Sequence, residues 1–402
     1  MDKIVGITAE YNPFHHGHLY QIRKIRSRFP EAGIMAVLST SFLQRGVPAL
    51  MDKWRRAKAA VLCGADLVLE LPLPFCCNNA GVFASAAVAL MKATGVVNAI
   101  SFGMESSGKL LCTVSDILVQ EVPAFKFYLQ KSLKSGFSYA EARSRAIETL
   151  CPGAAELTRK PNNTLAVAYA EAVKRQKADL ELLPVPRCGA GYYDLSEGPM
   201  MSAQGIREAL TNGRKEQALQ AMPEASAEIL REALASGQTC DDTKFLWQHL
   251  RLLLTRLTPE ELSHTAGISE GVEHRLLQIF SRCGSFEDLA AAAATRRYPK
   301  SRIRRQLMAL LLNISADEDR QFQRRGPAYI RPLAMNARGR QMLRAMQGMS
   351  SLPVITKPAA LHDDSYAQSI MALEFRGAAI WQSLTARPDF DAEKKATPWI
   401  AD

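Results

Sequence analysis

Cysteine patterns that hold metals or disulfide scaffolds are absent from the sequence. Eight cysteines are spread over 402 residues without a Cys-x-x-Cys pair, and the adjacent Cys76 and Cys77 cannot easily bridge each other. The seven histidines show no zinc-type spacing with them. These absences argue against a structural zinc site, and they predict reduced, mostly buried thiols in a cytoplasmic protein.

Long hydrophobic runs are missing as well. No stretch of about 18 apolar residues occurs, and the Ala-rich segment 82–93 is too short to span a bilayer, which predicts a buried helix there. The N-terminus runs directly into an apolar strand, without the core and cleavage site of a secretion signal. We therefore expect no membrane partner.

Charged residues are frequent, and basic residues outnumber acidic ones. Lys and Arg number 50 against 40 Asp and Glu, which gives a net charge of +10 and a pI of about 9.2. This is a weak sign of a nucleic-acid partner. Cations cluster on the first predicted helix, at residues 296–305 around Tyr298, and at Arg324, Arg325 and Arg331 near Tyr329.

Basic residues interleaved with aromatics suit an RNA backbone and an unstacked base. Solvated helix faces are the alternative interpretation of such clusters. The predicted RNA contacts are Arg296, Arg297, Lys300, Arg304 and Arg305.

Strand and helix signals alternate in the first half of the chain. Short apolar runs at 3–9, 33–39, 66–71 and 96–102 predict buried strands, and residues 18–29, 53–63 and 79–93 predict helices between them. This alternation is typical of an α/β fold with a parallel sheet covered on both faces. Helices are expected over 106–176, then a fifth strand at 181–186, a Gly-rich loop at 187–199 and a loop-to-helix junction at 202–210.

The second half is mostly helical by its pattern. Helices are predicted at 228–235, 244–257, 302–312 and 338–346, with one possible strand at 353–356. A boundary at 212–223 divides the chain into an α/β domain, residues 1–215, and a mainly α-helical basic domain, residues 224–402.

The sharpest motif lies where the first strand gives way to the first helix. Residues 10–19 read EYNPFHHGHL, with the core His15-x-Gly17-His18. A helix N-terminus at a strand end is a ready anion site, and Gly17 lets a phosphate approach the backbone. His15 and His18 can donate hydrogen bonds that stabilise charge growing on an α-phosphate. A His-rich loop without a role, or a chance metal site, is the alternative.

The His-x-Gly-His motif resembles that of the nucleotidyltransferase superfamily. The longer string AEYNPFHHGHL at 9–19 resembles one family more closely, the bacterial tRNA(Met) cytidine acetate ligases. Further matching stretches, spread over nearly the whole chain, are FLQRG at 42–46, DKW at 52–54, DLVLELP at 66–72, FGME at 102–105, KPNN at 160–163, Arg207, Gly339-Arg340 and SSLPVITK at 350–357.

This resemblance implies a Rossmann-like nucleotidyltransferase domain, residues 1–215, followed by a helical tRNA-binding domain. It also implies an activity: acetate and ATP form acetyl-adenylate and pyrophosphate, and the acetyl group moves to N4 of the wobble cytidine of elongator tRNA(Met). Adenylation supplies the leaving group that acetate lacks, so the enzyme needs positioning and electrostatics rather than a covalent nucleophile. Mg²⁺ is expected with the triphosphate, although no protein metal ligand can be named.

The resemblance implies His15, His18 and Arg207 as catalytic residues. The implied ATP-binding residues are Ile7, Thr8, Ala9, Glu10, Tyr11, Asn12, Pro13, Phe14, His15, His16, Gly17, His18, Leu19, Tyr20, Gly103, Asn162, Asn163, Arg187, Cys188 and Ser202. For several of these residues a purely structural role is the alternative to ATP binding. Gly103 can be a plain turn, Asn162 or Ser202 a helix N-cap, and Arg187 or Arg207 a surface charge.

Two other functions stay open from the sequence. One is a small-molecule adenylyltransferase that acts on a phosphorylated metabolite. The other is a non-enzymatic RNA-binding protein with a vestigial nucleotide fold.

Overall fold

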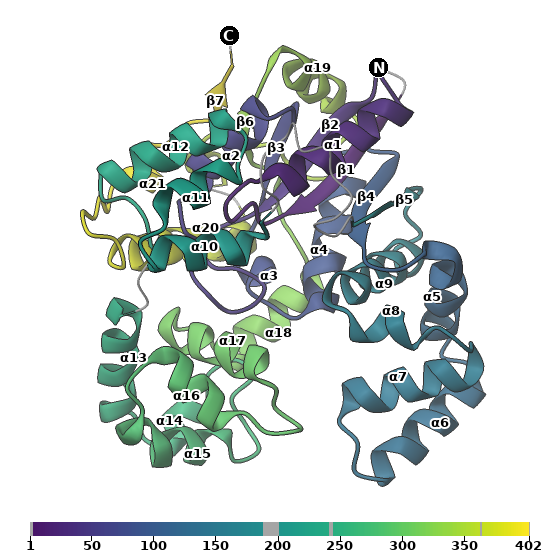
Figure 1. Ribbon diagram of the computed structural model, residues 1–402, viewed down its shortest axis with the longest axis vertical. Coiled ribbons are helices and arrows are strands. Elements are labelled where there is room, and N and C mark those ends of the chain that lie inside the picture. Colours follow the sequence, from purple (N-terminus) through teal and green to yellow (C-terminus); the bar gives the residue numbers. More distant parts are fainter. Residues whose placement is uncertain (1–2, 188–200, 241–243, 362–363, 402) are drawn as a thin grey trace.

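A mostly parallel seven-stranded sheet forms the centre of the computed structural model, which describes residues 3–187, 201–240, 244–361 and 364–401 (Figure 1). The strand order is β5-β4-β1-β2-β3-β6-β7. The strands are β1 Ile4–Ala9, β2 Gly33–Ser39, β3 Leu67–Leu71, β4 Ala99–Met104, β5 Glu181–Pro186, β6 Pro332–Met335 and β7 Trp399–Ile400. β1 to β5 are mutually parallel, and β6 pairs antiparallel with β3. The expected α/β class with a mostly parallel sheet is confirmed.

Helices cover both faces of this sheet. In the first half they are α1 His16–Arg28, α2 Lys53–Leu62, α3 Leu73–Cys76, α4 Ala80–Ala93, α5 Leu111–Gln120, α6 Pro123–Lys134, α7 Tyr139–Leu150, α8 Ala155–Arg159, α9 Pro161–Arg175 and α10 Ala203–Thr211. Those of the second half are α11 Lys215–Gln220, α12 Glu224–Ala235, α13 Lys244–Arg256, α14 Pro259–Ser263, α15 Val272–Ile279, α16 Phe286–Ala293, α17 Lys300–Leu311, α18 Ala316–Arg325, α19 Ala337–Met346, α20 Ser365–Gln382 and α21 Ala392–Lys395. Short 3-10 turns are η1 Gly108–Leu110, η3 Phe280–Arg282 and η4 Pro358–Leu361. None of the helices in these ranges has the length and apolarity to cross a membrane.

The central strands are buried on both faces because their side chains alternate between two hydrophobic cores. Val5 and Ile7 of β1 face the core shared with α1, α2 and α12, whereas Ile4 faces the core shared with α4 and α9. Gly6 lets α4 come close, since a Cβ there would meet Met91 Sδ at 2.6 Å. The predicted strands and helices of residues 3–104 are therefore confirmed, with α1 beginning two residues earlier than expected.

The predicted strand at 353–356 is wrong. Val354 forms only an isolated bridge with Ile330, and the strands of the second half are β6 and β7. β6 escaped prediction because it is four residues long and begins with a proline, which marks edge strands. Since β6 and β7 complete the sheet, the sheet is not confined to residues 1–215, and the expected boundary at 212–223 does not coincide with its edge.

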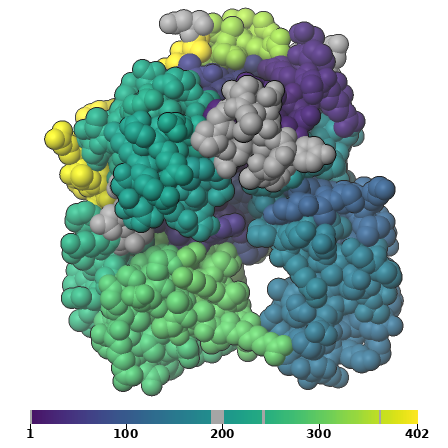
Figure 2. Space-filling view, in the orientation of Figure 1, coloured from purple at the N-terminus to yellow at the C-terminus, as the bar shows by residue number. Residues whose placement is uncertain are grey.

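Two helical lobes lie below the sheet in Figure 1, opposite the chain termini. One contains α6 and α7, and the other contains α13 to α17. Figure 2 shows an opening between these lobes, which touch at its lower edge. One contact between the lobes joins Arg296 to Phe137: the Arg296 guanidinium lies 5.0 Å from the centroid of the Phe137 ring, and the Arg145 guanidinium lies 3.8 Å from the same centroid.

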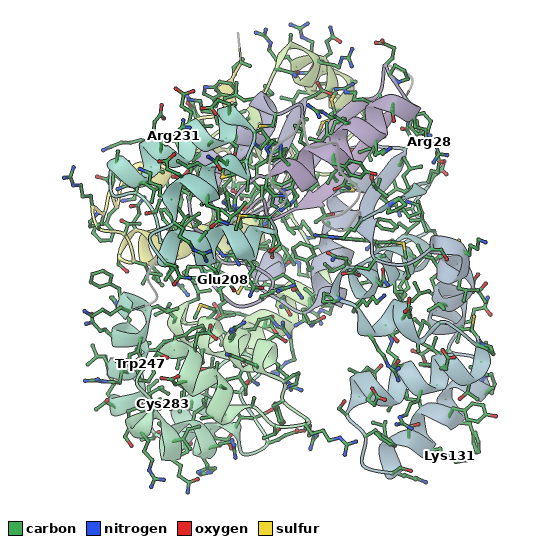
Figure 3. The ribbon with its side chains drawn as sticks, in the orientation of Figure 1. Arg28, Lys131, Glu208, Arg231, Trp247 and Cys283 are labelled. Carbon is green, nitrogen blue, oxygen red and sulfur yellow. The ribbon has the colours of Figure 1, made fainter. Side chains whose placement is uncertain are left out.

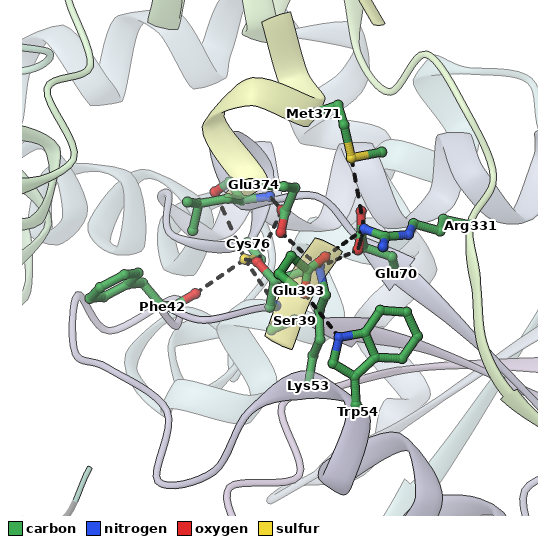
Figure 4. A network of polar contacts seen from close by, with 12 residues as sticks. Ser39, Phe42, Lys53, Trp54, Glu70, Cys76, Arg331, Met371, Glu374 and Glu393 are labelled. Carbon is green, nitrogen blue, oxygen red and sulfur yellow. Dashed lines mark hydrogen bonds and ion pairs between the residues drawn. The ribbon is translucent and has the colours of Figure 1, made fainter. Parts of the chain in front are cut away.

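A buried ionic cluster ties the C-terminal helices to the sheet (Figure 4). We use this name for Lys53, Glu70, Arg331, Glu374 and Glu393. Lys53 Nζ lies 2.6, 3.1 and 2.9 Å from carboxylate oxygens of Glu70, Glu374 and Glu393, and Arg331 pairs with Glu70 and Glu393. Arg331 is 1% exposed. The prediction that it belongs to an RNA-facing cluster is therefore wrong: its charge serves the fold.

Candidate active site

A cavity of about 630 Å³, called here the first cavity, opens at the carboxyl ends of β1, β4 and β5. Ligands of open parallel sheets bind at this edge. Its walls come from the segment after β1, the start of α1, the 43–46 turn, α9 and the start of α10. Elements far apart in the sequence thus converge on the histidine motif.

Hydrogen bonds within the His15–His18 segment fix both imidazoles. His15 is the N-cap of α1, and its Nδ1 accepts from the Gly17 amide at 3.0 Å. His18 Nδ1 accepts from the His15 amide at 3.2 Å, which completes a capping box. The rings stack with centroids 3.8 Å apart. Because each Nδ1 is an acceptor, the proton of each neutral ring resides on Nε2, and both rings offer an Nε2–H donor.

Both histidines are neutral at physiological pH. Burial, aided by the positive charges of Arg187, His16 and Arg207, lowers the pKa of the His15 imidazole to about 3. Burial, with His15 and Arg187 adding to it, also places the pKa of His18 well below its ordinary value. The pair therefore binds anions by neutral N–H donation.

A histidine NMR titration tests this arrangement. We expect the ring signals of His15 and His18 to stay unshifted from pH 8 to about pH 5 in the folded protein, because the neutral form persists there. The same signals in the urea-unfolded chain should shift near pH 6.5. Since the fold lowers these pKa values, acidification below about 6.5 favours the unfolded state. A midpoint near 6.5 in the folded protein would contradict the buried, capped geometry.

Three arginines add positive charge to the first cavity: Arg45, Arg187 and Arg207. Arg207 Nη1 donates to the carbonyl oxygens of Asn12 at 2.6 Å and Ala203 at 3.1 Å, so it is not the surface charge of the alternative interpretation. Burial lowers the pKa of Arg207, but a guanidinium stays charged in proteins.

The KPNN segment approaches the first cavity through Glu105. Its carboxylate accepts from the backbone amides of Asn162 at 3.3 Å and Asn163 at 3.0 Å, at the start of α9. Asn162 is therefore not the helix cap; Lys160 holds the N-cap position. The Asn162 side chain donates to Glu105 through its amide nitrogen, and its Oδ1 accepts from Arg187 Nη1 at 3.1 Å. Asn162 thus orients Arg187.

An Asn162→Ala variant should bind ATP more weakly. It leaves the Arg187 guanidinium without its amide acceptor, and hydrogen bonds to charged groups are worth about 1.5–3 kcal/mol, so the KM for ATP should rise roughly tenfold or more. Steady-state kinetics of pyrophosphate release measure this change. An unaltered KM would show that the contact with Arg187 does not matter for the nucleotide.

One wall of the first cavity is apolar. Phe102 and Tyr169 stack with ring centroids 5.6 Å apart, and Phe83, Leu165 and Val185 lie in the same lining. A cavity with cations on one side and aromatic rings on another suits a ligand with a polyanionic part and a flat apolar part.

Arg56 holds the backbone from which the histidine motif begins. This residue is fully buried, and its guanidinium donates to the carbonyls of Glu10 at 2.7 Å, Ser39 at 3.0 Å and Thr40 at 2.6 Å. These carbonyls lie just after β1 and at the end of β2. Arg56 therefore holds together the strand ends from which the motif and the next loop depart.

The structure brings most of the predicted site residues together. Those lining the first cavity are Ile7, Thr8, Ala9, Glu10, Tyr11, His15, Gly17, His18, Tyr20, Gly103, Asn162, Arg187, Ser202 and Arg207. Ser202 is also the N-cap of α10. Those that do not line it are Asn12, Pro13, Phe14, His16, Leu19 and Asn163. Cys188 and the rest of the predicted loop beyond residue 187 lie outside the described residues.

The predicted RNA contacts divide into cations that pair with a glutamate and cations that contact an aromatic ring or a backbone carbonyl. Arg297 pairs with Glu270 at 2.7 Å, and Lys300 and Arg304 both pair with Glu287. Arg296 lies over Phe137, and Arg305 reaches the Gln44 carbonyl at 3.3 Å.

Several lining residues were not identified from the sequence. They are Gln21, Gln44, Arg45, Phe83, Phe102, Glu105, Pro161, Leu165, Tyr169, Val185, Pro186, Met201, Ala203 and Gln204. One signal was available: Asn162, Leu165 and Tyr169 follow the i, i+3, i+7 spacing that marks one helix face. Arg45 and Glu105 stand in the FLQRG and FGME stretches.

Comparisons with known proteins show the family of the chain. Residues 2–396 match the family model described as HIGH Nucleotidyl Transferase. The tRNA(Met) cytidine acetate ligase of Acetivibrio thermocellus is 33% identical over 88% of both chains, and that of a Thermoanaerobacter strain is 33% identical over 94% of this chain and 96% of its own.

Solved structures give the same result. A crystal structure of Thermotoga maritima TmcAL bound with alpha-thio ATP superposes with a TM-score of 0.89 at 28% identity, and the apo form gives 0.91 at 29%; each covers 99% of both chains. The chain belongs to the HIGH nucleotidyl transferase family and, within it, to the tRNA(Met) cytidine acetate ligases.

Proposed function

We propose that the protein activates acetate with ATP and acetylates N4 of the wobble cytidine of elongator tRNA(Met). One observation carries this proposal: two neutral Nε2–H donors and the N-terminus of α1 share a cavity with three arginines at the carboxyl edge of the sheet. The relatives' names point to the same reaction.

In the first step, an acetate oxygen attacks the α-phosphorus of ATP. The bond from this phosphorus to the oxygen bridging to the β-phosphate breaks, and pyrophosphate leaves with that electron pair. We propose that His15 and His18 donate to the phosphate oxygens where charge grows. Arg187 and Arg207 offset the charge of the leaving pyrophosphate, and the Phe102–Tyr169 wall receives the adenine.

In the second step, the cytidine N4 lone pair attacks the acetyl carbon. The bond between this carbon and the phosphate oxygen breaks, AMP leaves, and N4 loses a proton. We propose Glu10 as the acceptor of that proton. Its Oε1 accepts from the Gln44 amide at 2.9 Å, whereas its Oε2 has no partner within the described parts of the chain.

Mg²⁺ would enter with the triphosphate. In the ranges that the structure describes, no three His, Cys, Asp or Glu side chains form a metal site. Glu10 and Glu105 are the carboxylates of the first cavity, and Glu105 already caps α9. The ion would therefore be held mainly by phosphate oxygens and water, and would neutralise phosphate charge. We place the reaction in the cytoplasm.

Mass spectrometry of tRNA nucleosides tests the proposal. The protein is incubated with ATP, carbon-13-labelled acetate and bulk tRNA, and the RNA is digested to nucleosides. Labelled N4-acetylcytidine, dependent on both ATP and acetate, is the expected product. ATP consumption with adenylyl transfer to a small metabolite, and no labelled nucleoside, would instead support a small-molecule adenylyltransferase.

A further inference from the structure

A second cavity of about 330 Å³ lies on the other side of the 43–46 turn from the first. It is enclosed by the α3–α4 junction and by α17 and α18. Its polar lining includes Asn78, Asn79, Arg302, Arg305, Gln306 and Asp319. This volume lies at the lower end of the range of small-ligand sites, roughly 300–1,000 Å³.

The two cavities share a wall. Gln44 and Arg45 line the first cavity, and Arg305, which lines the second, donates to the Gln44 carbonyl. The turn sits tightly on α17, because a Cβ at Gly46 would meet the Arg305 backbone nitrogen at 2.5 Å. The 43–46 turn therefore separates a ligand in the second cavity from the first cavity. In the space-filling view, a strip of the N-terminal segment is visible between the teal helices and the green lobe that contains α17 (Figure 2).

Arg302 and Arg305 bring two positive charges to the lining of the second cavity. Neither Arg302 nor Arg305 forms an ion pair within the described ranges, unlike their neighbours Lys300 and Arg304, which share Glu287. The Tyr298 ring holds the Arg302 guanidinium at 4.3 Å from its centroid. The carboxylate of Asp319 is occupied, since it accepts from Asn78 at 3.1 Å and Gln323 at 2.7 Å. Two guanidiniums that line one cavity without a carboxylate partner in the described ranges fit a phosphate group.

Gln306 adds an unused acceptor. Its side chain is 3% exposed, its Nε2 donates to the Gly267 carbonyl, and its Oε1 has no hydrogen-bond partner among the atoms described. A buried amide oxygen without a donor is costly, and an N–H of a ligand would satisfy it. The phosphodiester of an RNA has no proton with which to donate this bond, whereas a nucleobase amino or ring N–H can. Within an RNA, the lining therefore suits a phosphate together with a base.

We propose that the second cavity binds a nucleotide of the RNA substrate that neighbours the acetylated cytidine. Its phosphate would lie between Arg302 and Arg305, and its base would donate to Gln306. The cytidine must leave the stack to reach the first cavity, and specific recognition of loop RNA commonly splays adjacent bases into pockets. This inference rests on the proposed function, and it specifies how that function selects its RNA.

An Arg302→Ala variant tests the proposal through RNA binding and acetylation. The dissociation constant for a synthetic anticodon stem-loop of elongator tRNA(Met) should rise roughly tenfold, and the slope of log affinity against log salt should fall by about 1. Acetate-dependent pyrophosphate release without RNA should stay at the wild-type rate. Arg302→Lys, which keeps the charge, should recover part of the affinity. The matched control is Arg231→Ala. Arg231 lies on α12, away from α17 (Figure 3), and pairs with Glu224. This variant should bind the stem-loop with wild-type affinity.

The outcomes separate this inference from the proposed function. Wild-type RNA affinity and salt slope in Arg302→Ala would overturn the second-cavity site, even if the protein acetylates tRNA normally. If the wild type released no pyrophosphate with acetate, the proposed function would fail, while the stem-loop titration still decides whether the cavity binds RNA. Weaker binding of inorganic phosphate or free CMP by Arg302→Ala, with unchanged stem-loop affinity, would assign the cavity to a free ligand and overturn the RNA proposal.

Discussion

A His18→Ala variant is expected to lose acetate-dependent pyrophosphate release by about 10²–10³-fold, the usual cost of removing one donor to charge that develops in a transition state. His18 lines the first cavity, and its Nδ1 accepts from the His15 amide, so its Nε2–H is free to donate to a phosphate. The chemical step should slow more than ATP binding weakens, because the donated bond strengthens as charge grows. Pyrophosphate release and ATP titrations on the same variant measure both quantities.

His16→Ala is the matched control, since it removes an imidazole two positions away. His16 belongs to the same motif but does not line the first cavity, and its backbone amide donates to the Ala221 carbonyl at 3.4 Å. We expect its activity to stay within about threefold of wild type, as for a residue outside the lining. Full activity in His18→Ala, with circular dichroism showing an intact fold, would remove His18 from the reaction.

A Lys53→Met variant is expected to destabilise the protein by about 3–5 kcal/mol, the cost of leaving buried charge unpaired. Burial alone would lower the pKa of Lys53, but the carboxylates of Glu374, Glu393 and Glu70 raise it, so the lysine stays charged. Without it, Glu70 and Glu393 keep the ion pairs with Arg331, whereas Glu374 loses the one ion pair that it forms within the described residues. Urea unfolding at pH 7 measures the loss, and wild-type stability would show that the ionic cluster contributes little.

Glu374→Gln is the companion variant, and its effect depends on pH. Burial and the neighbouring Glu70 and Glu393 outweigh Lys53 and raise the pKa of Glu374 to about 7, above its ordinary value of 4.5. The folded state therefore binds more protons than the unfolded state between these values, and this contribution to stability is lost as pH rises towards 7. The difference in unfolding free energy between wild type and variant should shift in favour of the variant from pH 5 to pH 8. A difference independent of pH would contradict the raised pKa.

Local patterns in the sequence were sufficient for the five parallel strands β1 to β5 and for the histidine motif, but not for β6 and β7. Apolar runs bounded by turn residues located β1 to β4, because these strands are buried on both faces and read as continuous apolar segments. The motif at 15–18 pointed to the first cavity, and its own hydrogen bonds close within four residues. These strands and this motif are predictable because their structure depends on residues that are close together in the sequence.

Contacts between residues far apart in the sequence could not be predicted from these local patterns. Lys53, Glu70 and Arg331 are charged residues that are usually exposed, and only the fold brings them together in the interior. The lining of the first cavity is similar: Arg45 and Tyr169 reach it from the 43–46 turn and from α9. Tyr169 shares a helix face with Asn162, and Arg45 stands in the FLQRG stretch, but neither local signal shows which distant element packs beside these residues.

Charge clusters gave the least specific prediction. Residues 296–305 form one basic run in the sequence, yet Arg297, Lys300 and Arg304 meet glutamates in the fold, while Arg302 and Arg305 face a cavity. Pairing depends on Glu270 and Glu287, whose positions the run itself does not reveal. The structure thus turns a general expectation of RNA contact into a proposal about two particular side chains.

The most direct measurement of the central claim follows acetate oxygen into the products. The protein is incubated with ATP, tRNA and acetate labelled with oxygen-18, and the nucleotides and phosphates are analysed by mass spectrometry. If an acetate oxygen attacks the α-phosphorus at the histidine motif, each AMP released carries one labelled oxygen and pyrophosphate carries none. Label in inorganic phosphate together with ADP, or unlabelled AMP, would show that acetate is not activated as an adenylate.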